Sequence, residues 1–151
     1  MEIRTFKCRI GWITVSVNQG AIVAISYSKQ ESRPSSDTPS ALLDRAEEQL
    51  LAYLDGKLQT FDLPIRLVGT PFQVSVWKAL LAIPYGSTSS YGDIATRIGC
   101  PKAARAVGMA CNRNPLMIVV PCHRVVGTKG RLTGFACGLD IKRQLLEIER
   151  I

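Results

Sequence analysis

The chain of 151 residues is long enough to bury a hydrophobic core, as one domain or as two small ones. Hydrophobic residues make up 46% of it, so it should fold without covalent cross-links. No run of about 18 apolar residues occurs, which excludes a membrane-spanning helix. The first residues, MEIRTFKCRI, carry charges where a signal peptide needs an apolar stretch, so we expect a soluble intracellular protein.

The cysteines indicate free thiols. There are five of them, at positions 8, 100, 111, 122 and 137, and none forms a Cys-x-x-Cys pair. An odd number cannot close into a complete disulfide set, so a reducing compartment fits best. His123 is the only histidine, so a zinc site would need ligands from scattered positions. We therefore expect no metal and no other cofactor.

The net charge of +7 is unevenly distributed along the chain. Residues 1–69 contain eight Lys/Arg and eight Asp/Glu, whereas residues 70–151 contain eleven Lys/Arg and four Asp/Glu, so the whole excess lies in the second part. This asymmetry predicts two domains, a supporting domain of residues 1–69 and a domain of residues 70–151 that contacts a polyanion. The alternative is a basic surface that only keeps the protein soluble.

The first part predicts a small antiparallel sheet followed by a helix. Residues 3–10, 12–17 and 21–27 are short β-rich runs separated by turn sequences. Residues 28–40 are polar and contain proline, which predicts a loop. From Ser40 the spacing of Leu43, Ala46, Leu50 and Leu54 is helical, and Gly56 ends the pattern. Residues 61–67 predict a further strand.

The second part begins with a predicted helix that has Thr70 as N-cap and Pro71 at its first position. Its buried stripe should consist of apolar residues at helical spacing. These are Phe72, Val76 and Leu80, backed by Trp77 and Leu81.

Two short helices should follow, joined by a Gly-Cys-Pro turn in the outline of a helix-turn-helix. Ser90 and Asp93 have capping-box spacing at the start of the first. In the second, residues 102–111, the core positions should be Ala103, Val107 and Ala110. Arg105 and Gly108 then face outward, where small residues let a helix approach a partner closely and an arginine can enter a groove. The alternative is an ordinary alanine-rich helix with a solvated arginine.

The segment LMIVVPCHRVV, residues 116–126, predicts a buried β run interrupted by reactive residues. Cys122 precedes the only histidine, which could take its proton, so the pair is a candidate nucleophile and base. Adjacent side chains on an extended segment point to opposite sides, so contact requires a bend or a bridging water. Near the end of a last helix packed through Ile141, Leu145 and Ile148, Glu149 could orient the imidazole or be a surface residue.

The sequences PCHRVV, RAVGMACNRNP and GLDIKRQLLEIE together resemble the signature of the O6-alkylguanine-DNA alkyltransferases. The resemblance covers residues 70–150 closely, and the first part only in its length and element order. It implies an α+β fold, with a ribonuclease H-like sheet and helix in the first domain and a winged helix-turn-helix-like second domain that binds DNA and holds the site.

The resemblance also implies the role of each matched residue. Cys122 accepts the alkyl group, His123 deprotonates it through a water, and Glu149 completes the relay. Tyr91 helps to rotate the nucleotide out of the duplex and protonates the guanine, and Asn114 braces the active-site turn. Arg105 fills the space that the nucleotide leaves. The other expected DNA contacts are Lys102, Ala104, Gly108, Arg113 and Arg124. The expected substrate pocket consists of Val125, Phe135, Ala136, Cys137 and Gly138, with the carbonyls of Cys122 and Val125 accepting from the guanine amino group.

Two departures from the family pattern affect the pocket. Residues 135–139 are Phe-Ala-Cys-Gly-Leu, where many relatives have Tyr-Ser-Gly-Gly-Leu. The lost hydroxyls and the bulkier Cys137 should change the size of alkyl group that fits. Cys137 is either a small packing residue or a second thiol that pairs with Cys122 under oxidation. The zinc ligands of some relatives are not matched.

The expected function is a single, irreversible transfer of an alkyl group from O6-alkylguanine in double-stranded DNA to Cys122, in a cytoplasmic monomer that is nucleoid-associated if prokaryotic. O4-alkylthymine is a second substrate that the sequence leaves open. One alternative is a non-catalytic protein that binds alkylated DNA, but such proteins replace the acceptor cysteine. Another is a winged-helix regulator that senses oxidants or alkylators through Cys122, for which the sequence shows neither an operator-reading helix nor a dimer face.

Overall fold

The computed structural model describes residues 1–31 and 34–150. The chain forms two compact units, one of Met1–Leu67 with Pro115–Met117 and the other of Val68–Asn114 with Ile118–Ile151. The assignment of a supporting role to residues 1–69 and a DNA-binding role to residues 70–151 stays a prediction.

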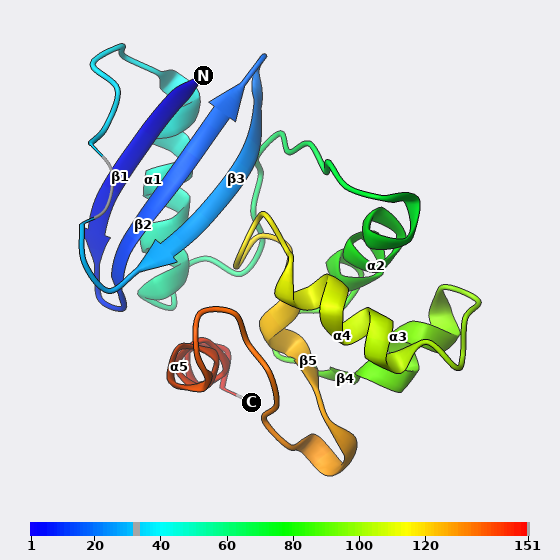
Figure 1. Cartoon of the computed structure of the whole chain (residues 1–151). Coiled ribbons are helices and arrows are strands. Elements are labelled where there is room, and N and C mark those ends of the chain that lie inside the picture. Colours follow the sequence, from blue (N-terminus) through cyan, green and yellow to red (C-terminus); the bar gives the residue numbers. More distant parts are fainter. Residues whose placement is uncertain (32–33, 151) are drawn as a thin grey trace. The chain divides into compact units, whose positions relative to one another are not determined.

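The first unit is a three-stranded antiparallel sheet with one helix packed on it (Figure 1). Its elements are β1 (Glu2–Cys8), β2 (Gly11–Asn18), β3 (Ala21–Ser28) and α1 (Ala41–Leu54). Alternation of side chains along β2 places Ile13, Val15 and Val17 on one face, and all three are buried. The three predicted strands and the predicted helix are therefore confirmed.

Helix α1 begins where the sequence predicts. The Ser40 hydroxyl accepts a hydrogen bond from the Leu43 backbone N–H at 3.1 Å. The buried positions Leu43, Ala46 and Leu50 recur at helical spacing, together with Tyr53 and Leu54. The helix thus buries one face against the sheet.

One predicted strand of the first unit does not form, and one predicted loop lies partly outside the described residues. Residues 61–67 do not form a strand: Ile65 makes only an isolated parallel bridge with Ile22, because Pro64 has no N–H to donate to a ladder. The predicted loop of residues 28–40 includes Ser32 and Arg33, which lie outside the described residues, and its other residues beyond β3 form neither helix nor strand.

The second unit is mostly helical and carries a two-stranded parallel pair (Figure 1). Its elements are α2 (Pro71–Leu81), β4 (Ser89–Ser90), α3 (Tyr91–Arg97), α4 (Ala104–Asn112), the 3₁₀ turn η1 (Cys122–Arg124), β5 (Val125–Val126), η2 (Thr128–Gly130) and α5 (Leu139–Ile148). Both predicted N-termini are confirmed, since Thr70 with Gln73 caps α2 and Ser90 with Asp93 caps α3 in capping boxes. The fold is α+β, as expected.

The packing of α2 and α4 differs in part from the predicted stripes. Val76, Trp77 and Leu80 are buried, but Leu81 is 42% exposed because it lies on the outer side of the last turn of α2. The Trp77 indole N–H donates to the Ala110 carbonyl at 2.9 Å and so joins α2 to α4. Helix α4 begins two residues later than predicted, so that Ala103 is its half-buried N-cap rather than a core residue.

The predicted β run over residues 116–126, interrupted by Pro-Cys-His-Arg, forms only at its end. These residues are buried as expected, yet the chain turns after Leu116 and only Val125 and Val126 form a strand. Ile118 has a φ of 72°, which is costly for a β-branched residue and reverses the chain direction. Buried apolar runs of this length do not distinguish strand from turn by periodicity.

Across residues 1–31 and 34–150, the helices are all too short or too polar to cross a bilayer.

Candidate active site

The site is built on a bend at Pro121-Cys122. Pro121 has φ −81° and ψ 64°, and residues 122–124 then form a single 3₁₀ turn in which the Arg124 N–H donates to the Pro121 carbonyl at 3.0 Å. The sequence required a bend or a bridging water between Cys122 and His123, and the bend is present. Both side chains are buried, with 5% of Cys122 and 0% of His123 exposed.

Asn114, two residues beyond the end of α4, braces this bend. Its side-chain Nδ2 donates to the Val120 carbonyl at 2.8 Å and to the Cys122 sulfur at 3.2 Å. Burial raises the pKa of the Cys122 thiol to about 11, and the Asn114 hydrogen bond opposes that rise. The resting thiol therefore keeps its proton at neutral pH and needs a base to become a nucleophile.

His123 has the properties of that base. Its Nε2 lies 2.7 Å from Oε2 of Glu149. Burial lowers the pKa of His123 below its ordinary value of 6.5, against the opposing effect of Glu149, so the ring is neutral at pH 7. Because a carboxylate only accepts, the neutral ring carries its hydrogen on Nε2, and Nδ1 is the nitrogen that accepts a proton.

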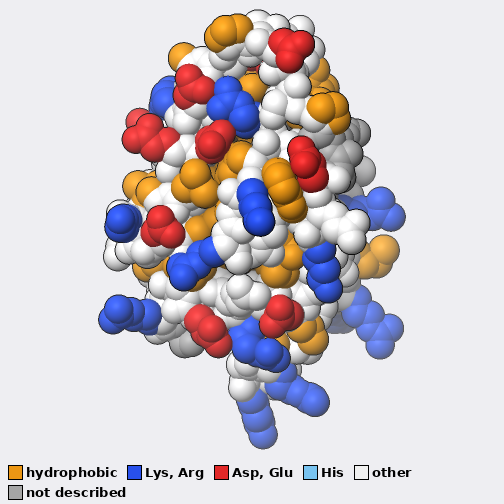
Figure 2. Space-filling view, turned by 90° about the vertical axis from the view of Figure 1, so that its left-hand side faces the viewer, with side chains coloured by type: hydrophobic (Ala, Val, Ile, Leu, Met, Phe, Trp, Pro, Cys, Tyr) orange, Lys and Arg blue, Asp and Glu red, His pale blue; other side chains and the backbone are white. Residues whose placement is uncertain are grey.

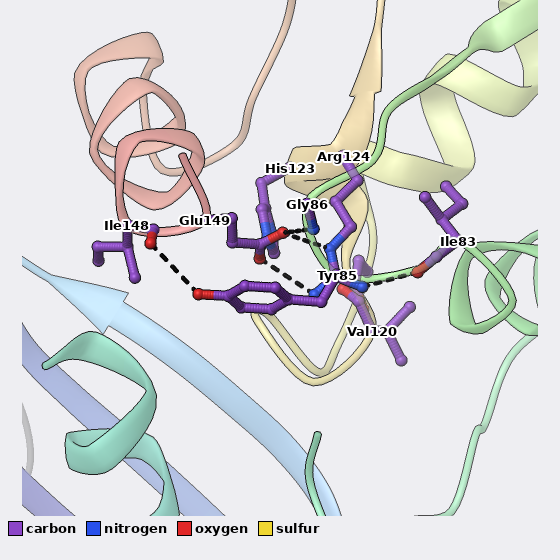
Figure 3. A network of polar contacts seen from close by, with 9 residues as sticks. Ile83, Tyr85, Gly86, Val120, His123, Arg124, Ile148 and Glu149 are labelled. Atoms are coloured by element: carbon purple, nitrogen blue, oxygen red, sulfur yellow. Dashed lines mark hydrogen bonds and ion pairs between the residues drawn. The ribbon is translucent and has the colours of Figure 1, made fainter. Parts of the chain in front are cut away.

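Glu149 is held by donors from three sides (Figure 3). Its Oε1 accepts from Arg124 Nε at 2.8 Å and from the Gly86 backbone N–H at 3.2 Å. Its Oε2 accepts from Arg124 Nη2 at 3.1 Å as well as from His123. This carboxylate is 4% exposed and fixed in one orientation, so the interpretation of Glu149 as a surface residue is wrong.

The expectation that Arg124 contacts DNA is also wrong. The side chain is buried, its guanidinium binds Glu149 on one edge, and Nη1 donates to the Ile83 carbonyl at 2.7 Å. It also lies 5.6 Å from the ring centroid of Tyr85, whose hydroxyl donates to the Ile148 carbonyl at 3.2 Å. Arg124 thus anchors the end of α5 beside His123 (Figure 3).

Sequence reasoning missed Arg124 and Tyr85 as parts of this network. One signal was present: an arginine inside an apolar run needs a buried carboxylate, and Glu149 lies one helical turn after Leu145 of the apolar stripe of the last helix.

A cavity of about 530 Å³ opens beside the site, between α3, α4 and the segment that follows β5. The described residues that line it are Ser90, Tyr91, Gly92, Ala104, Arg105, Gly108, Asn112, Gly127, Thr128, Thr133 and Gly134. The lining thus includes Tyr91 and three of the predicted DNA contacts on α4. Cys122, Val125 and residues 135–138 are outside it, and Phe135 and Cys137 are half-buried in the loop that follows Gly134.

Tyr91 connects the cavity with the buried nucleophile. Burial raises the pKa of its phenol, and the nearby Cys111 and Cys122 sulfurs raise it further, so the hydroxyl keeps its proton at neutral pH. That hydroxyl donates to the Thr133 carbonyl at 3.1 Å. The proton predicted for the guanine is therefore present and held at the wall of the cavity.

The outer face of α4 carries the remaining predicted DNA contacts. Arg105 and Arg113 are exposed, as is Lys102 in the turn before the helix, and Ala104 and Gly108 are half-buried. Met109, which sequence reasoning did not single out, is 64% exposed on this face, one helical turn after Arg105.

Lys142 is a second residue that sequence reasoning missed. It is 0% exposed, its Nζ donates to the Thr133 carbonyl at 2.8 Å, and it lies 5.9 Å from the ring centroids of both Tyr91 and Phe135. Nothing in the sequence marks it, because a lysine beside an apolar helix stripe usually extends into solvent. Among the described residues, no group of His, Cys, Asp or Glu side chains could hold a metal ion.

Comparison of the chain with known proteins identifies its family. The family model described as "6-O-methylguanine DNA methyltransferase, DNA binding domain" matches residues 71–151. A methylated-DNA–protein-cysteine methyltransferase of Mycobacterium tuberculosis is 47% identical over 99% of this chain and 93% of its own length. The chain belongs to the methylated-DNA–protein-cysteine methyltransferase family.

Other members of the methyltransferase family support the same assignment over the whole chain. A relative from Methanosarcina acetivorans is 45% identical over 99% of this chain and 98% of its own length. The crystal structure of Mycobacterium tuberculosis OGT in complex with DNA superposes with a TM-score of 0.88, at 47% identity, over 98% of this chain and 92% of that one. The similarity therefore extends into the first unit, where the sequence showed only a matching length and element order.

Proposed function

We propose that this chain repairs DNA by moving the alkyl group of O6-alkylguanine onto the sulfur of Cys122, once per molecule. The observation that carries the proposal is the buried set of Cys122, His123 and Glu149, braced by the half-buried Asn114, with Tyr91 between it and an open cavity. The set supplies a soft nucleophile, a neutral base with an orienting carboxylate, and an acid, which are the groups that this transfer needs.

The transfer balances with these groups alone. The sulfur forms a bond to the alkyl carbon as the carbon–oxygen bond breaks, and the bonding electrons pass to the guanine oxygen. The thiol proton passes to His123 Nδ1, and Tyr91 supplies a proton to the guanine ring, so that no free anion is expelled. The product is a thioether, which none of these groups can hydrolyse, so the reaction stops after one event.

Duplex DNA is the proposed partner because the target oxygen is inaccessible within the base stack. Rotating the nucleotide outward costs a few kcal/mol, which contacts from the basic second unit offset. On the face drawn in Figure 2, Lys and Arg side chains project from the lower end. One site per chain suffices, so we propose that a monomer of the cytoplasm performs the repair.

The direct test is incubation with duplex DNA that carries O6-methylguanine labelled in its methyl group. We expect about one label per chain, recovered on the peptide that contains Cys122. Label on another residue, or several turnovers per chain, would refute the proposal.

Arg105→Ala should slow repair of duplex DNA by about tenfold to a hundredfold, because its side chain replaces the extruded nucleotide in the stack. The rate with free O6-benzylguanine, which needs no extrusion, should be unchanged. Single-turnover kinetics on both substrates measure the difference, with the exposed Arg97→Ala as matched control. Equal losses on both substrates would argue against a role in extrusion.

The transfer rate should have a plateau around neutral pH. The active form of His123 is neutral, and burial lowers its pKa below 6.5, so activity is lost only as the pH falls below about 6.5. Measuring the reaction with free O6-benzylguanine from acid to alkaline pH separates this effect from DNA binding. A rate that instead rises about tenfold per pH unit through neutrality would show that hydroxide, not His123, removes the thiol proton.

A further inference from the structure

The Thr133 carbonyl accepts two hydrogen bonds in the second unit. The Tyr91 hydroxyl donates to it at 3.1 Å and Lys142 Nζ donates to it at 2.8 Å. The two donors come from different helices, Tyr91 from the start of α3 and Lys142 from the first turns of α5. Residues 131–138 connect η2 to α5 and contain Thr133. The Thr133 carbonyl oxygen therefore joins this segment to the side chains of both Tyr91 and Lys142.

Burying the Lys142 ammonium costs free energy unless neighbouring groups compensate its charge. Among the lysines in residues 1–31 and 34–150, only Lys142 has a fully buried side chain. Burial lowers the pKa of its ammonium, and an ammonium without compensation would cost several kcal/mol. Its partners are the Thr133 carbonyl and the rings of Tyr91 and Phe135, each 5.9 Å away.

In the proposed reaction, Tyr91 must give up its hydrogen bond to Thr133, whereas Lys142 need not. To give its proton to guanine, Tyr91 must turn its hydroxyl away from Thr133. When that donor leaves, the Thr133 carbonyl keeps one hydrogen bond fewer to the site, and the segment that carries it is held less firmly. The proposed reaction takes its proton from Tyr91 and none from Lys142, so the bond from Lys142 to Thr133 can persist while the base is bound.

We propose that Lys142 is a positioning residue that keeps residues 131–138 attached to the site when the Tyr91 hydroxyl leaves Thr133 for the bound base. This inference rests on the proposed function for the step in which Tyr91 leaves. The same segment carries Phe135, so its attachment also fixes the ring that is available to pack on the base.

The Lys142 ammonium also affects the ionisation of the buried thiols at the same site. Its charge lowers the pKa of the buried Cys122 and Cys111 thiols, against the larger, opposite effect of their burial. Removing the ammonium should therefore make the Cys122 thiolate harder to form as well as loosen residues 131–138.

Hydrogen exchange in the DNA-free protein tests the shared carbonyl without any reaction. Lys142→Met and Tyr91→Phe each remove one donor, so each alone should leave most of the protection of the hydrogen-bonded amides in residues 131–138. These are the amides of Arg131 and Gly138, which donate to the Thr128 and Phe135 carbonyls at 3.4 and 2.9 Å. The double variant should exchange there about tenfold faster than the two single effects predict. Additive effects in the double variant would overturn the proposal. Arg143→Met, at an exposed neighbouring position on α5, is the matched control and should leave exchange unchanged.

The DNA-bound state tests the step itself. In a Cys122→Ala background bound to duplex O6-methylguanine DNA, Lys142→Met alone should release residues 131–138, since Tyr91 is then engaged with the base. Unchanged protection would overturn the proposal. If the Cys122→Ala protein does not bind this DNA, the proposed function fails, and the DNA-free comparison still decides whether Lys142 holds Thr133.

Transfer kinetics complete the test. Lys142→Met should react about tenfold more slowly or worse with free O6-benzylguanine, because the ring-bearing segment is misplaced. Lys142→Arg, which keeps a cationic donor, should recover most of the rate, and Arg143→Met should match the parent chain. A rate for Lys142→Met within twofold of the parent would overturn the proposal.

Discussion

A Cys122→Ala variant should transfer no detectable methyl group from O6-methylguanine DNA and should still bind the duplex. Without the sulfur there is no atom to attack the alkyl carbon, so the base His123 and the acid Tyr91 cannot bring about transfer. Cys111 cannot substitute, because burial raises the pKa of its thiol to about 12 and holds it in the protonated form. The variant removes one small buried atom, which should cost about 1 kcal/mol, so the fold is retained.

Mass spectrometry of the labelled chain and anisotropy of labelled DNA measure transfer and binding separately. Cys100→Ala is the matched control, since Cys100 is an exposed thiol in the same unit and should transfer normally when mutated. Residual transfer by Cys122→Ala at the parent rate would identify another acceptor. Transfer lost equally in Cys100→Ala would indicate that the loss has a cause other than the nucleophile.

Elements that depend on neighbouring residues were predictable from the sequence. At Thr70, Ser90 and Ser40 the capping side chain accepts a hydrogen bond from the backbone N–H three residues later, and all three caps form. The strands of the first unit alternate at period two between turn sequences, and these also form as predicted. Local chemistry therefore determined where most elements begin.

Features that depend on distant residues were not predictable in the same way. The apolar residues 116–120 are buried, yet they turn because the Asn114 side chain binds the Val120 carbonyl and Ile118 adopts a positive φ. Neither fact follows from hydrophobic periodicity. The candidate nucleophile and base were found from the chain because they are adjacent. The chain left Glu149 as either an orienting carboxylate or a surface residue, and the structure shows it buried against His123.

The charged residues were the hardest to place. Arg124 was expected to contact DNA on the strength of the family resemblance, but its guanidinium binds a carboxylate 25 residues away. Lys142 was not assigned at all, because its partner is a backbone carbonyl, which any residue could supply. A sequence shows where charges are, but the fold decides which of them are buried together.

Glu149→Gln should cause the second large loss, in both stability and transfer. The amide carries no charge, so the buried guanidinium of Arg124 loses its counterion, which should cost about 3–5 kcal/mol. At about 2–4 °C per kcal/mol for a chain of this size, the melting temperature should fall by roughly 6–20 °C. The stability of a typical domain, about 5–15 kcal/mol, leaves the variant folded at room temperature.

The loss in transfer has a separate cause. With one acceptor oxygen, the amide cannot accept from both Arg124 and His123 as the carboxylate does. If its NH₂ faces the ring, the hydrogen of the imidazole moves to Nδ1, which then cannot take the thiol proton. The single-turnover rate with free O6-benzylguanine should fall by about 10²–10⁴-fold, measured well below the melting temperature.

Arg124→Lys separates the two effects, because it loses the two-point contact with Glu149 and keeps both the charge and the acceptor for His123. It should lower the melting temperature and transfer at close to the parent rate. Glu147→Gln, an exposed change on α5, should alter neither property. If Arg124→Lys loses transfer as severely as Glu149→Gln, rigidity of the helix end rather than the hydrogen on His123 Nε2 controls the reaction.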